Sequence, residues 1–239
     1  MQDDFFKRLE PLYGTTGLSQ IAQAKVILFG VGGVGSWCAE ALVRSGIKNL
    51  TLVDPDQVVE SNVNRQLPAS KETLGEYKVE VLARRLSQLL PNLSIQPNTS
   101  RYTKDTSSSF DLKSYDIIID AIDSLTDKVN LILTANQLAI PIFSSLGAAG
   151  RIDPSKIRHA DIWESSGCPL GKNLRAILRK NNFAGNFQVV FSQETPRAGY
   201  AKSENKGEKP ILGSVITVTA SFGMTLASLV LNHLAFENH

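Results

Sequence analysis

A run of glycines directly follows a short apolar segment, and it limits the possible folds of this chain more than any other feature. Residues 24–29 (AKVILF) have the continuous apolar pattern of a strand buried on both faces. Residues 30–35 (GVGGVG) fit G-x-G-x-x-G, and apolar residues at helical spacing follow them up to Gly46. A glycine-rich turn between a strand and a helix lets backbone N–H groups approach a phosphate at the helix N-terminus. The sequence therefore predicts a nucleotide-binding unit, and the alternative is a tight turn without a ligand.

Further along, the chain alternates between strand and helix patterns. Short apolar runs at residues 49–53, 116–121 and 141–144 are typical of buried parallel strands, and apolar residues at helical spacing occur around 79–90 and 127–139. Alternation of this kind indicates an α/β fold in which helices cover both faces of a mostly parallel sheet. We therefore expect a doubly wound, Rossmann-like sheet that binds its ligand at the carboxyl ends of the strands.

The chain changes character after residue 150. Residues 151–210 are polar and basic, apart from an apolar stretch at 187–191 (FQVVF). The composition, 42% hydrophobic and 20% charged, excludes a disordered or fibrous protein, and 239 residues allow one large domain or two small ones. We interpret the chain as a single domain, 1–239, with a nucleotide-binding core at 1–150, an elaborated crossover insertion at 151–210 and an apolar C-terminal helix at 211–236.

The apolar stretch at 211–236 is long enough to span a bilayer. Its 26 residues include no Lys, Arg, Asp or Glu, but they include several Ser and Thr, and no basic flank follows. A buried core helix is the preferred interpretation, and a membrane contact is the alternative. Residues 1–10 (MQDDFFKRLE) lack the apolar core of a secretory signal, so we expect a cytoplasmic protein.

Charged residues beyond the glycine turn indicate which nucleotide is bound. Asp54 lies 19 residues beyond Gly35, where an acid can bond ribose hydroxyls. Arg65 and Lys78 could neutralise the β- and γ-phosphates of a triphosphate, and Asp123, at the end of an expected strand, could hold Mg²⁺. Hydride transfer needs none of these charges. We therefore expect a Mg·ATP site, although each residue alone also fits a surface charge or a helix N-cap.

These motifs resemble those of a known superfamily. The segments GVGGVGSW (30–37), LVDPD (52–56), SNVNRQ (61–66) and DAIDS (120–124), together with Lys78, are similar to the ubiquitin-activating-enzyme-like adenylating superfamily (ThiF/MoeB/HesA). Its bacterial members activate carboxylates with ATP and release pyrophosphate. The resemblance covers nearly the whole chain and implies that ATP is bound by Gly30, Gly32, Gly33, Gly35, Asp54, Asp56, Asn62, Arg65, Gln66 and Lys78, with Asp123 as the Mg²⁺ ligand.

The resemblance also implies an assembly. In dimers of this superfamily, an arginine near the N-terminus reaches the γ-phosphate bound by the partner subunit, and Arg8 is its best match in this chain. A homodimer is therefore expected, in which Arg8 joins Arg65, Lys78 and Asp123 as the catalytic residues. A sulfur-relay protein is a further candidate partner.

A narrower match identifies one branch of the superfamily. SLGAAGRIDPSKIR (145–158), with ADI (160–162) and CPL (168–170) downstream, resembles the tRNA threonylcarbamoyladenosine dehydratases. Those enzymes cyclise the threonylcarbamoyl group on an adenosine beside the anticodon, through adenylation of its carboxylate. The alternative is an adenylating enzyme for a ubiquitin-like sulfur-carrier protein of thiamine or molybdopterin synthesis. Such enzymes often hold zinc through two C-x-x-C pairs, and this chain has no C-x-x-C, so we expect no zinc.

Basic residues are concentrated where a tRNA substrate would enter. Residues 171–210 hold eight Lys and Arg against three Glu. Among them, Lys172, Arg175 and Arg179 have the spacing of one helical face. A surface that binds tRNA phosphates is one interpretation, and a solvated helix face is the other.

Two other function classes stay open at this point. The glycine motif alone also fits a nicotinamide- or flavin-dependent oxidoreductase, and a nucleotide-binding scaffold would bind ATP without releasing pyrophosphate. The two cysteines do not favour cysteine-based chemistry. Cys38 lies on an apolar helical face, and Cys168 could be exposed but has no base nearby in the sequence.

Overall fold

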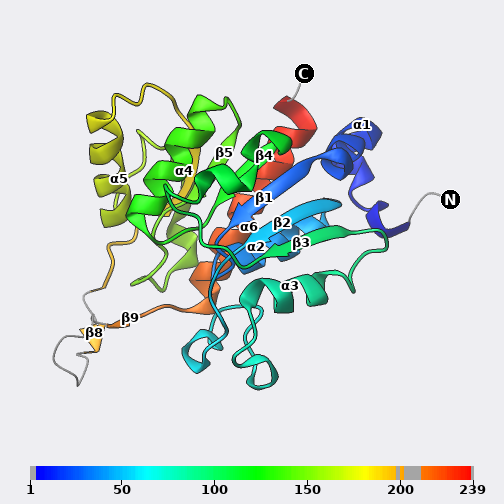
Figure 1. Ribbon diagram of the computed structural model, residues 1–239, viewed down its shortest axis with the longest axis horizontal. Helices are drawn as coiled ribbons and strands as arrows, with labels where there is room; N and C mark the ends of the chain where they lie inside the picture. The colour runs from blue at the N-terminus through cyan, green and yellow to red at the C-terminus, as the bar shows by residue number, and fades with distance from the viewer. Residues whose placement is uncertain (1–3, 198–199, 202–210, 238–239) are drawn as a thin grey trace.

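A mostly parallel sheet runs through the middle of the molecule (Figure 1). The computed structural model describes residues 4–197, 200–201 and 211–237. The sheet consists of β1 (Lys25–Phe29), β2 (Asn49–Val53), β3 (Ser94–Asn98), β4 (Ile117–Asp120), β5 (Ile142–Ser145), β6 (Ile157–Asp161) and β7 (Gln188–Ser192). Their order is β3-β2-β1-β4-β5-β7-β6, and neighbours pair in parallel except for β6, which is antiparallel to β7.

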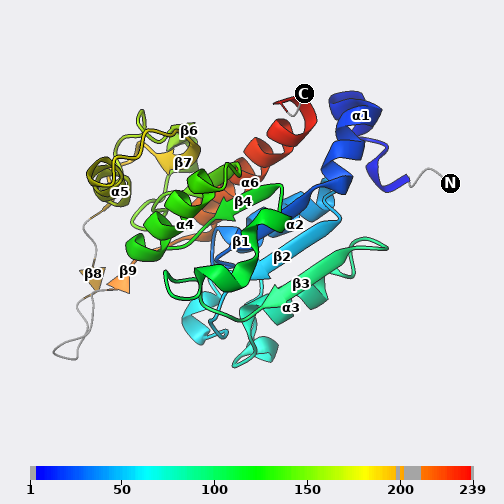
Figure 2. The same cartoon turned by 45° about the horizontal axis from the view of Figure 1, so that its top comes forward.

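Helices cover both faces of this sheet, as Figures 1 and 2 show. They are α1 (Glu10–Gln23), α2 (Gly35–Arg44), α3 (Lys78–Leu86), α4 (Leu125–Gln137), α5 (Pro169–Lys180) and α6 (Ile216–Asn232). Buried residues form two hydrophobic clusters. Helices α1, α2, α3 and α6 contribute to the first, and α4 and α5 contribute to the second. This arrangement confirms the doubly wound α/β fold predicted from the sequence.

The four strands that the sequence predicted, β1, β2, β4 and β5, are buried on both faces. In β1, Val26 and Leu28 belong to the first cluster and Ile27 and Phe29 to the second, so every one of these positions is apolar. The edge strands β3 (SIQPN) and β6 (IRHAD) were not predicted, because their side chains are exposed or half-buried and follow no apolar pattern. Helix α1 was not predicted either, since it buries few side chains.

Residues 151–197 extend the same sheet, and their apolar side chains join its hydrophobic clusters. Both β6 and β7 lie in this segment, and β7 pairs in parallel with β5. Helix α5, between them, packs into the second hydrophobic cluster. The segment therefore has the character of an elaborated crossover, and its limits at residues 150 and 210 stay predictions.

The apolar C-terminal stretch forms a core helix. Helix α6 begins at Ile216, later than the expected 211, because β9 (Ile211–Leu212) pairs with β8 (Tyr200–Ala201) before it. A π-helical turn, His233–Glu237, follows it. The helix is long and apolar enough to cross a membrane, yet 56% of its apolar window is buried inside the molecule. A Cβ on Gly223 would lie 2.5 Å from the carbonyl oxygen of Val34. Packing this close favours the core helix over a membrane contact.

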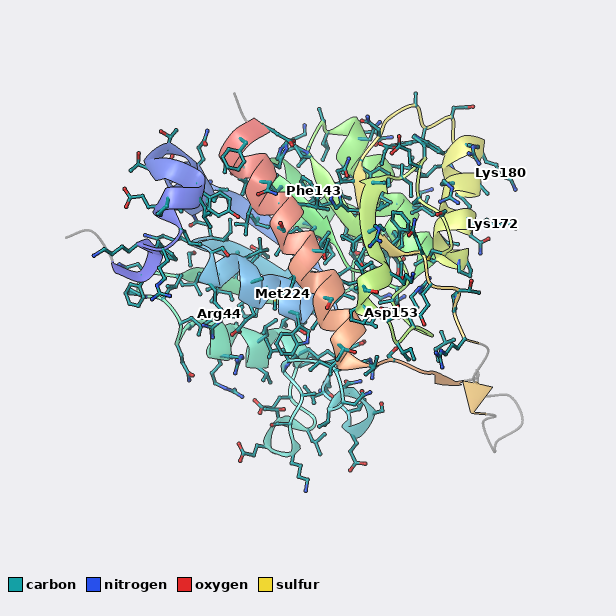
Figure 3. The ribbon with its side chains drawn as sticks, turned by 180° about the vertical axis from the view of Figure 1, so that it is seen from behind. Arg44, Phe143, Asp153, Lys172, Lys180 and Met224 are labelled. Carbon is teal, nitrogen blue, oxygen red and sulfur yellow. The ribbon has the colours of Figure 1, made fainter. Side chains whose placement is uncertain are left out.

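Replacing Gly223 by alanine should destabilise the fold, because the new methyl group would press on the backbone of α2 at Val34 and Cys38. Overpacking of this kind costs about 1–3 kcal/mol, which lowers the Tm of a chain of this size by several degrees. Thermal unfolding measures the change. Met224→Ala, on the exposed side of the same helix (Figure 3), is the control and should melt near the wild-type temperature. Equal Tm values for the two variants would contradict the packing argument.

Candidate functional site

The glycine loop lies at the carboxyl end of β1, in the middle of the sheet. Gly30 has a φ of +88°, and a Cβ there would lie 2.7 Å from the carbonyl oxygen of Ala121, just after β4. A Cβ on Gly35 would lie 1.8 Å from the carbonyl oxygen of Gly30. At Val34, no described side chain caps the N-terminus of α2, so the positive end of the helix is available to an anion. The turn therefore requires glycine and fits the predicted phosphate loop.

Asp54 follows β2 and is buried against the glycine loop. Its Oδ2 accepts a hydrogen bond from the backbone N–H of Val31 (2.8 Å), and its Oδ1 accepts one from the N–H of Asp56 (2.9 Å). Burial raises the pKa of Asp54, and these hydrogen bonds and the charge of Lys78 oppose the increase only in part. Each carboxylate oxygen has two lone pairs, so Asp54 can still accept hydrogen bonds from a sugar.

Arg65 and Gln66 flank the glycine loop from the segment that follows β2. A Cβ on Gly33 would lie 3.4 Å from Cγ of Arg65, and one on Gly32 would lie 3.8 Å from Nε2 of Gln66. The side chain of Gln66 is buried, yet its Oε1 has no hydrogen-bond partner among the described residues. Trp37 in α2 fixes this segment by donating from Nε1 to the carbonyl oxygen of Arg65 (3.0 Å). A polar ligand beside the loop would satisfy the orphaned amide oxygen.

Lys78 and Asn62 are buried at the same edge. Lys78 is the first residue of α3, and its Nζ lies 2.8 Å from Oδ2 of Asp56, whose side chain is mostly exposed. Asn62 has a structural role, because its Oδ1 accepts a hydrogen bond from the N–H of Val59 (3.2 Å). It thereby closes the short turn that leads into Arg65. Lys78 thus places a cation at this edge, and Asn62 shapes the segment that carries Arg65.

Asp123 follows β4 and is exposed. Its alternative interpretation as a helix N-cap is wrong, because Ser124 caps α4 by accepting from the N–H of Asp127. Arg101, which sequence reasoning missed, binds Asp127 at 3.0 Å. That hydrogen bond, and then the charges of Asp127, Asp123 and Asp56, raise the pKa of Arg101. Arg101 therefore lies near both Asp123 and Asp56. The one feature of the sequence that could have pointed to Arg101 is its position after β3, and that strand was itself not predicted.

Arg8 lies at the other end of the sheet. It is exposed in the turn between the 3₁₀ helix η1 (Asp4–Phe6) and α1. Phe6 approaches Gly46, which follows α2, since a Cβ on Gly46 would lie 3.8 Å from Cε1 of Phe6. The ten residues of α2 separate this end from the glycine loop by about 15 Å. The structure thus gathers every predicted nucleotide-binding residue except Arg8, whose action on a partner subunit stays a prediction.

The basic face expected on α5 is only partly present. Arg175 is half-buried and donates to Oγ of Ser165, so it does not point to solvent. The guanidinium carbon of Arg179 lies 5.2 Å from the ring centroid of Trp163, an exposed cation–π contact. Lys172 and Lys180 project outward from the helix (Figure 3). Three other basic residues of the segment, Lys202, Lys206 and Lys209, lie outside the described residues.

Both cysteines are buried. Cys38 lies in the first hydrophobic cluster, as expected, and burial raises the pKa of its thiol. The expectation that Cys168 could be exposed is wrong, because it packs at the start of α5 with its Sγ 3.6 Å from where a Cβ on Gly147 would lie. Neither thiol is placed to act as a nucleophile.

The chain is similar over nearly its whole length to known proteins. It matches the ThiF family over residues 6–235. It is 39% identical over 191 residues to the tRNA threonylcarbamoyladenosine dehydratase of Bacillus subtilis, covering 80% of this chain and 75% of the relative. It is 34% identical over 237 residues to that of Haemophilus influenzae, covering 93% and 90%. The Escherichia coli enzyme in complex with ATP shares its fold, with a TM-score of 0.85 and 34% identity over 96% of this chain and 93% of that one.

Asp54→Asn should change the pH dependence of stability. Burial raises the pKa of Asp54 above its ordinary value of 3.8, so between these two values the folded state binds more protons than the unfolded state. The wild type therefore loses stability from this group as the pH rises through that window, and the variant does not. We expect the free energy of unfolding of the variant, relative to the wild type, to increase as the pH rises from 3.8 through the raised pKa of Asp54.

Denaturant unfolding at a series of pH values measures this difference. Asp105→Asn, at an exposed position, supplies the matched control and should follow the wild-type profile. A difference between the wild type and Asp54→Asn that is constant over the whole range would show that burial does not govern the Asp54 carboxyl group.

Proposed function

The chain belongs to the ThiF family, and we propose that it acts as a tRNA threonylcarbamoyladenosine dehydratase. This enzyme uses ATP to cyclise threonylcarbamoyladenosine in tRNA, with the loss of one water from the modified nucleoside. One observation carries the proposal: the glycine loop, Arg65, Lys78 and Asp123 meet at one edge of the sheet. They do so in a chain that is similar to dehydratases over 93% of its length.

The first step activates a carboxylate. An oxygen of the threonyl carboxylate attacks the α-phosphorus of ATP, the bond from this phosphorus to the bridging oxygen breaks, and pyrophosphate leaves. The product is an acyl-adenylate. Negative charge develops on the leaving oxygen, and cations and N–H groups already in place stabilise it. In this proposal the stabilising groups are Arg65, Lys78 and the backbone of the glycine loop, and their position at one edge of the sheet supports it.

The second step closes the ring. The carbamoyl group of the same modification attacks the activated carbonyl carbon, loses a proton and expels AMP, which keeps the carboxylate oxygen. Because nucleophile and electrophile belong to one molecule, their effective concentration is high and no enzyme nucleophile is needed. The burial of both Cys38 and Cys168 is consistent with such a reaction.

The residues at this edge fit a magnesium ion that arrives with ATP. Mg²⁺ is typically bound through one or two carboxylates together with substrate phosphates, and not by an all-protein cage. The described residues include no group of three or more His, Cys, Asp or Glu that could hold a metal alone. Asp123 is exposed beside the site and would be the protein ligand. Bound there, the ion would neutralise phosphate charge.

Three further elements belong to the proposal. A homodimer would let Arg8 reach the γ-phosphate of the partner subunit, since Arg8 lies far from the glycine loop of its own chain. A tRNA substrate implies a cytoplasmic location, and the burial of α6 agrees with it. A sulfur-relay protein stays a candidate partner, and no contact among the described residues supports it.

Asp123→Ala should abolish pyrophosphate release and leave a folded protein, because the exposed side chain supports no core contact. The protein is incubated with ATP and tRNA that carries threonylcarbamoyladenosine. Released pyrophosphate is then measured, and the nucleosides are analysed by mass spectrometry for the loss of one water. Asp105→Ala, also exposed, is the control and should keep wild-type activity. Undiminished release by Asp123→Ala would contradict the assignment of this residue.

The same reaction separates the two adenylating functions. A dehydratase consumes ATP with the modified tRNA, whereas a sulfur-carrier enzyme would do so with a carrier protein that ends in Gly-Gly. The absence of any C-x-x-C from the sequence favours the first. Pyrophosphate release that needs the carrier and ignores the tRNA would overturn the proposed function.

Lys172→Gln with Lys180→Gln should weaken tRNA binding and its dependence on salt. Both side chains project from α5, and each lysine that no longer binds a phosphate should reduce the slope of log affinity against log salt by about 1. Binding assays between low and physiological salt measure the slope. Lys71→Gln with Lys113→Gln, exposed lysines outside α5, form the control pair. Equal slopes for the two pairs would support the solvated helix face instead.

A further inference from the structure

A buried ion pair lies directly beneath the loop that carries Asp123. Lys128 in α4 and Asp120 at the end of β4 are both completely buried, and Nζ of the lysine lies 2.6 Å from Oδ2 of the aspartate. The hydroxyl of Ser144 donates to the same oxygen at 2.6 Å. Lys128 also donates to the carbonyl oxygen of Ser145 at 3.0 Å. One ammonium group thus joins the carboxyl ends of the neighbouring strands β4 and β5.

The other oxygen of Asp120 holds the loop itself. Its Oδ1 accepts a hydrogen bond from the backbone N–H of Ile122 at 3.0 Å. On the opposite side, Ala121 donates from its N–H to the carbonyl oxygen of Phe29 at 2.8 Å, and its own carbonyl closely approaches Gly30. Ala121 and Ile122 are therefore fixed between the glycine loop and the Asp120 carboxylate. Asp123 is the next residue along this constrained backbone.

A buried ion pair is weak evidence for a role in stability. A buried pair contributes little compared with well-packed apolar side chains of similar volume, because both charges must be removed from water. A charged pair can, however, fix the orientation of a carboxylate. When an ammonium group holds one carboxylate oxygen, the other oxygen points in a fixed direction, and the hydrogen bonds that this charged group accepts are stronger than those between neutral groups. At this position the fixed direction is that of Ile122 and Asp123.

We propose that Lys128 is a positioning residue, which holds Asp120 so that the loop of residues 121–123 presents Asp123 toward magnesium and the ATP phosphates. This inference rests on the proposed function. Groups that orient a metal ligand without touching the metal matter for affinity, and their loss typically weakens metal binding about 10–100-fold. The positioning role predicts a specific defect, in the contribution of magnesium to ATP binding and not in nucleotide binding as such.

Calorimetry of ATP binding with Mg²⁺ and with EDTA tests the role. In Lys128→Met, the affinity for ATP in EDTA should stay close to the wild-type value, while the gain produced by Mg²⁺ should fall about tenfold or more. Lys128→Arg, which keeps the cation, should retain more of the gain. The double variant Asp120→Asn with Lys128→Met leaves no unpaired buried charge, so its folded state should be more stable than that of Lys128→Met. Its magnesium-dependent gain in ATP affinity should also fall.

An ion pair with one exposed partner supplies the control, since the side chain of Arg85 is 46% exposed. Glu40 in α2 is 5% exposed and binds Arg85 of α3 at 3.1 Å, away from the loop of residues 121–123. Glu40→Gln with Arg85→Met should lower the Tm and leave the magnesium-dependent gain unchanged. A wild-type gain in folded Lys128 variants would overturn the positioning role, as would the failure of both the single Met variant and the double variant to fold. A wild-type protein that does not bind ATP would instead overturn the proposed function.

Discussion

Close backbone contacts that only glycine allows set the arrangement of both the core and the site. Around the end of β1, Gly30 lies against the carbonyl group of Ala121, Gly35 lies against that of Gly30, and Gly223 lies against the first turn of α2. Strand β1, helices α2 and α6 and the end of β4 are therefore held at one point, with no side chain between their backbones. Because the loop of Asp123 begins at this point, the core sets the geometry of the site, and the flanking loops add groups to it.

Polar groups at this edge are buried with their partners in place. Asp54 is held by the backbone of the glycine loop, Lys78 by Asp56, and the segment of Arg65 by the indole of Trp37. A site arranged in this way has little reorganisation to undergo when charge develops on a leaving phosphate. The buried Oε1 of Gln66 has no partner among the described residues, which makes it a group that a ligand can satisfy.

The features of the fold and the site that could be predicted are those encoded by residues close together in the sequence. The fully buried strands and the glycine turn are visible in consecutive residues, and the carboxyl-edge rule then places Asp54 and Asp123 together. Arg101 and Lys128 were missed, because their importance comes from partners 26 and 8 residues away, respectively. The prediction of a basic face on α5 was wrong in part for the same reason, because helical spacing could not show that Arg175 turns inward to Ser165.

The burial of both thiols limits what can follow adenylation in the proposed reaction. A cysteine relay needs an accessible thiol with a lowered pKa, and here burial raises the pKa of Cys38 while Cys168 is covered at the start of α5. An acyl-adenylate formed at this edge must therefore be consumed by a nucleophile that the substrate brings. A carbamoyl group on the same adenosine is such a nucleophile, and its attack is intramolecular. The chemistry then requires of the protein only that it bind ATP and align one carboxylate beside the glycine loop.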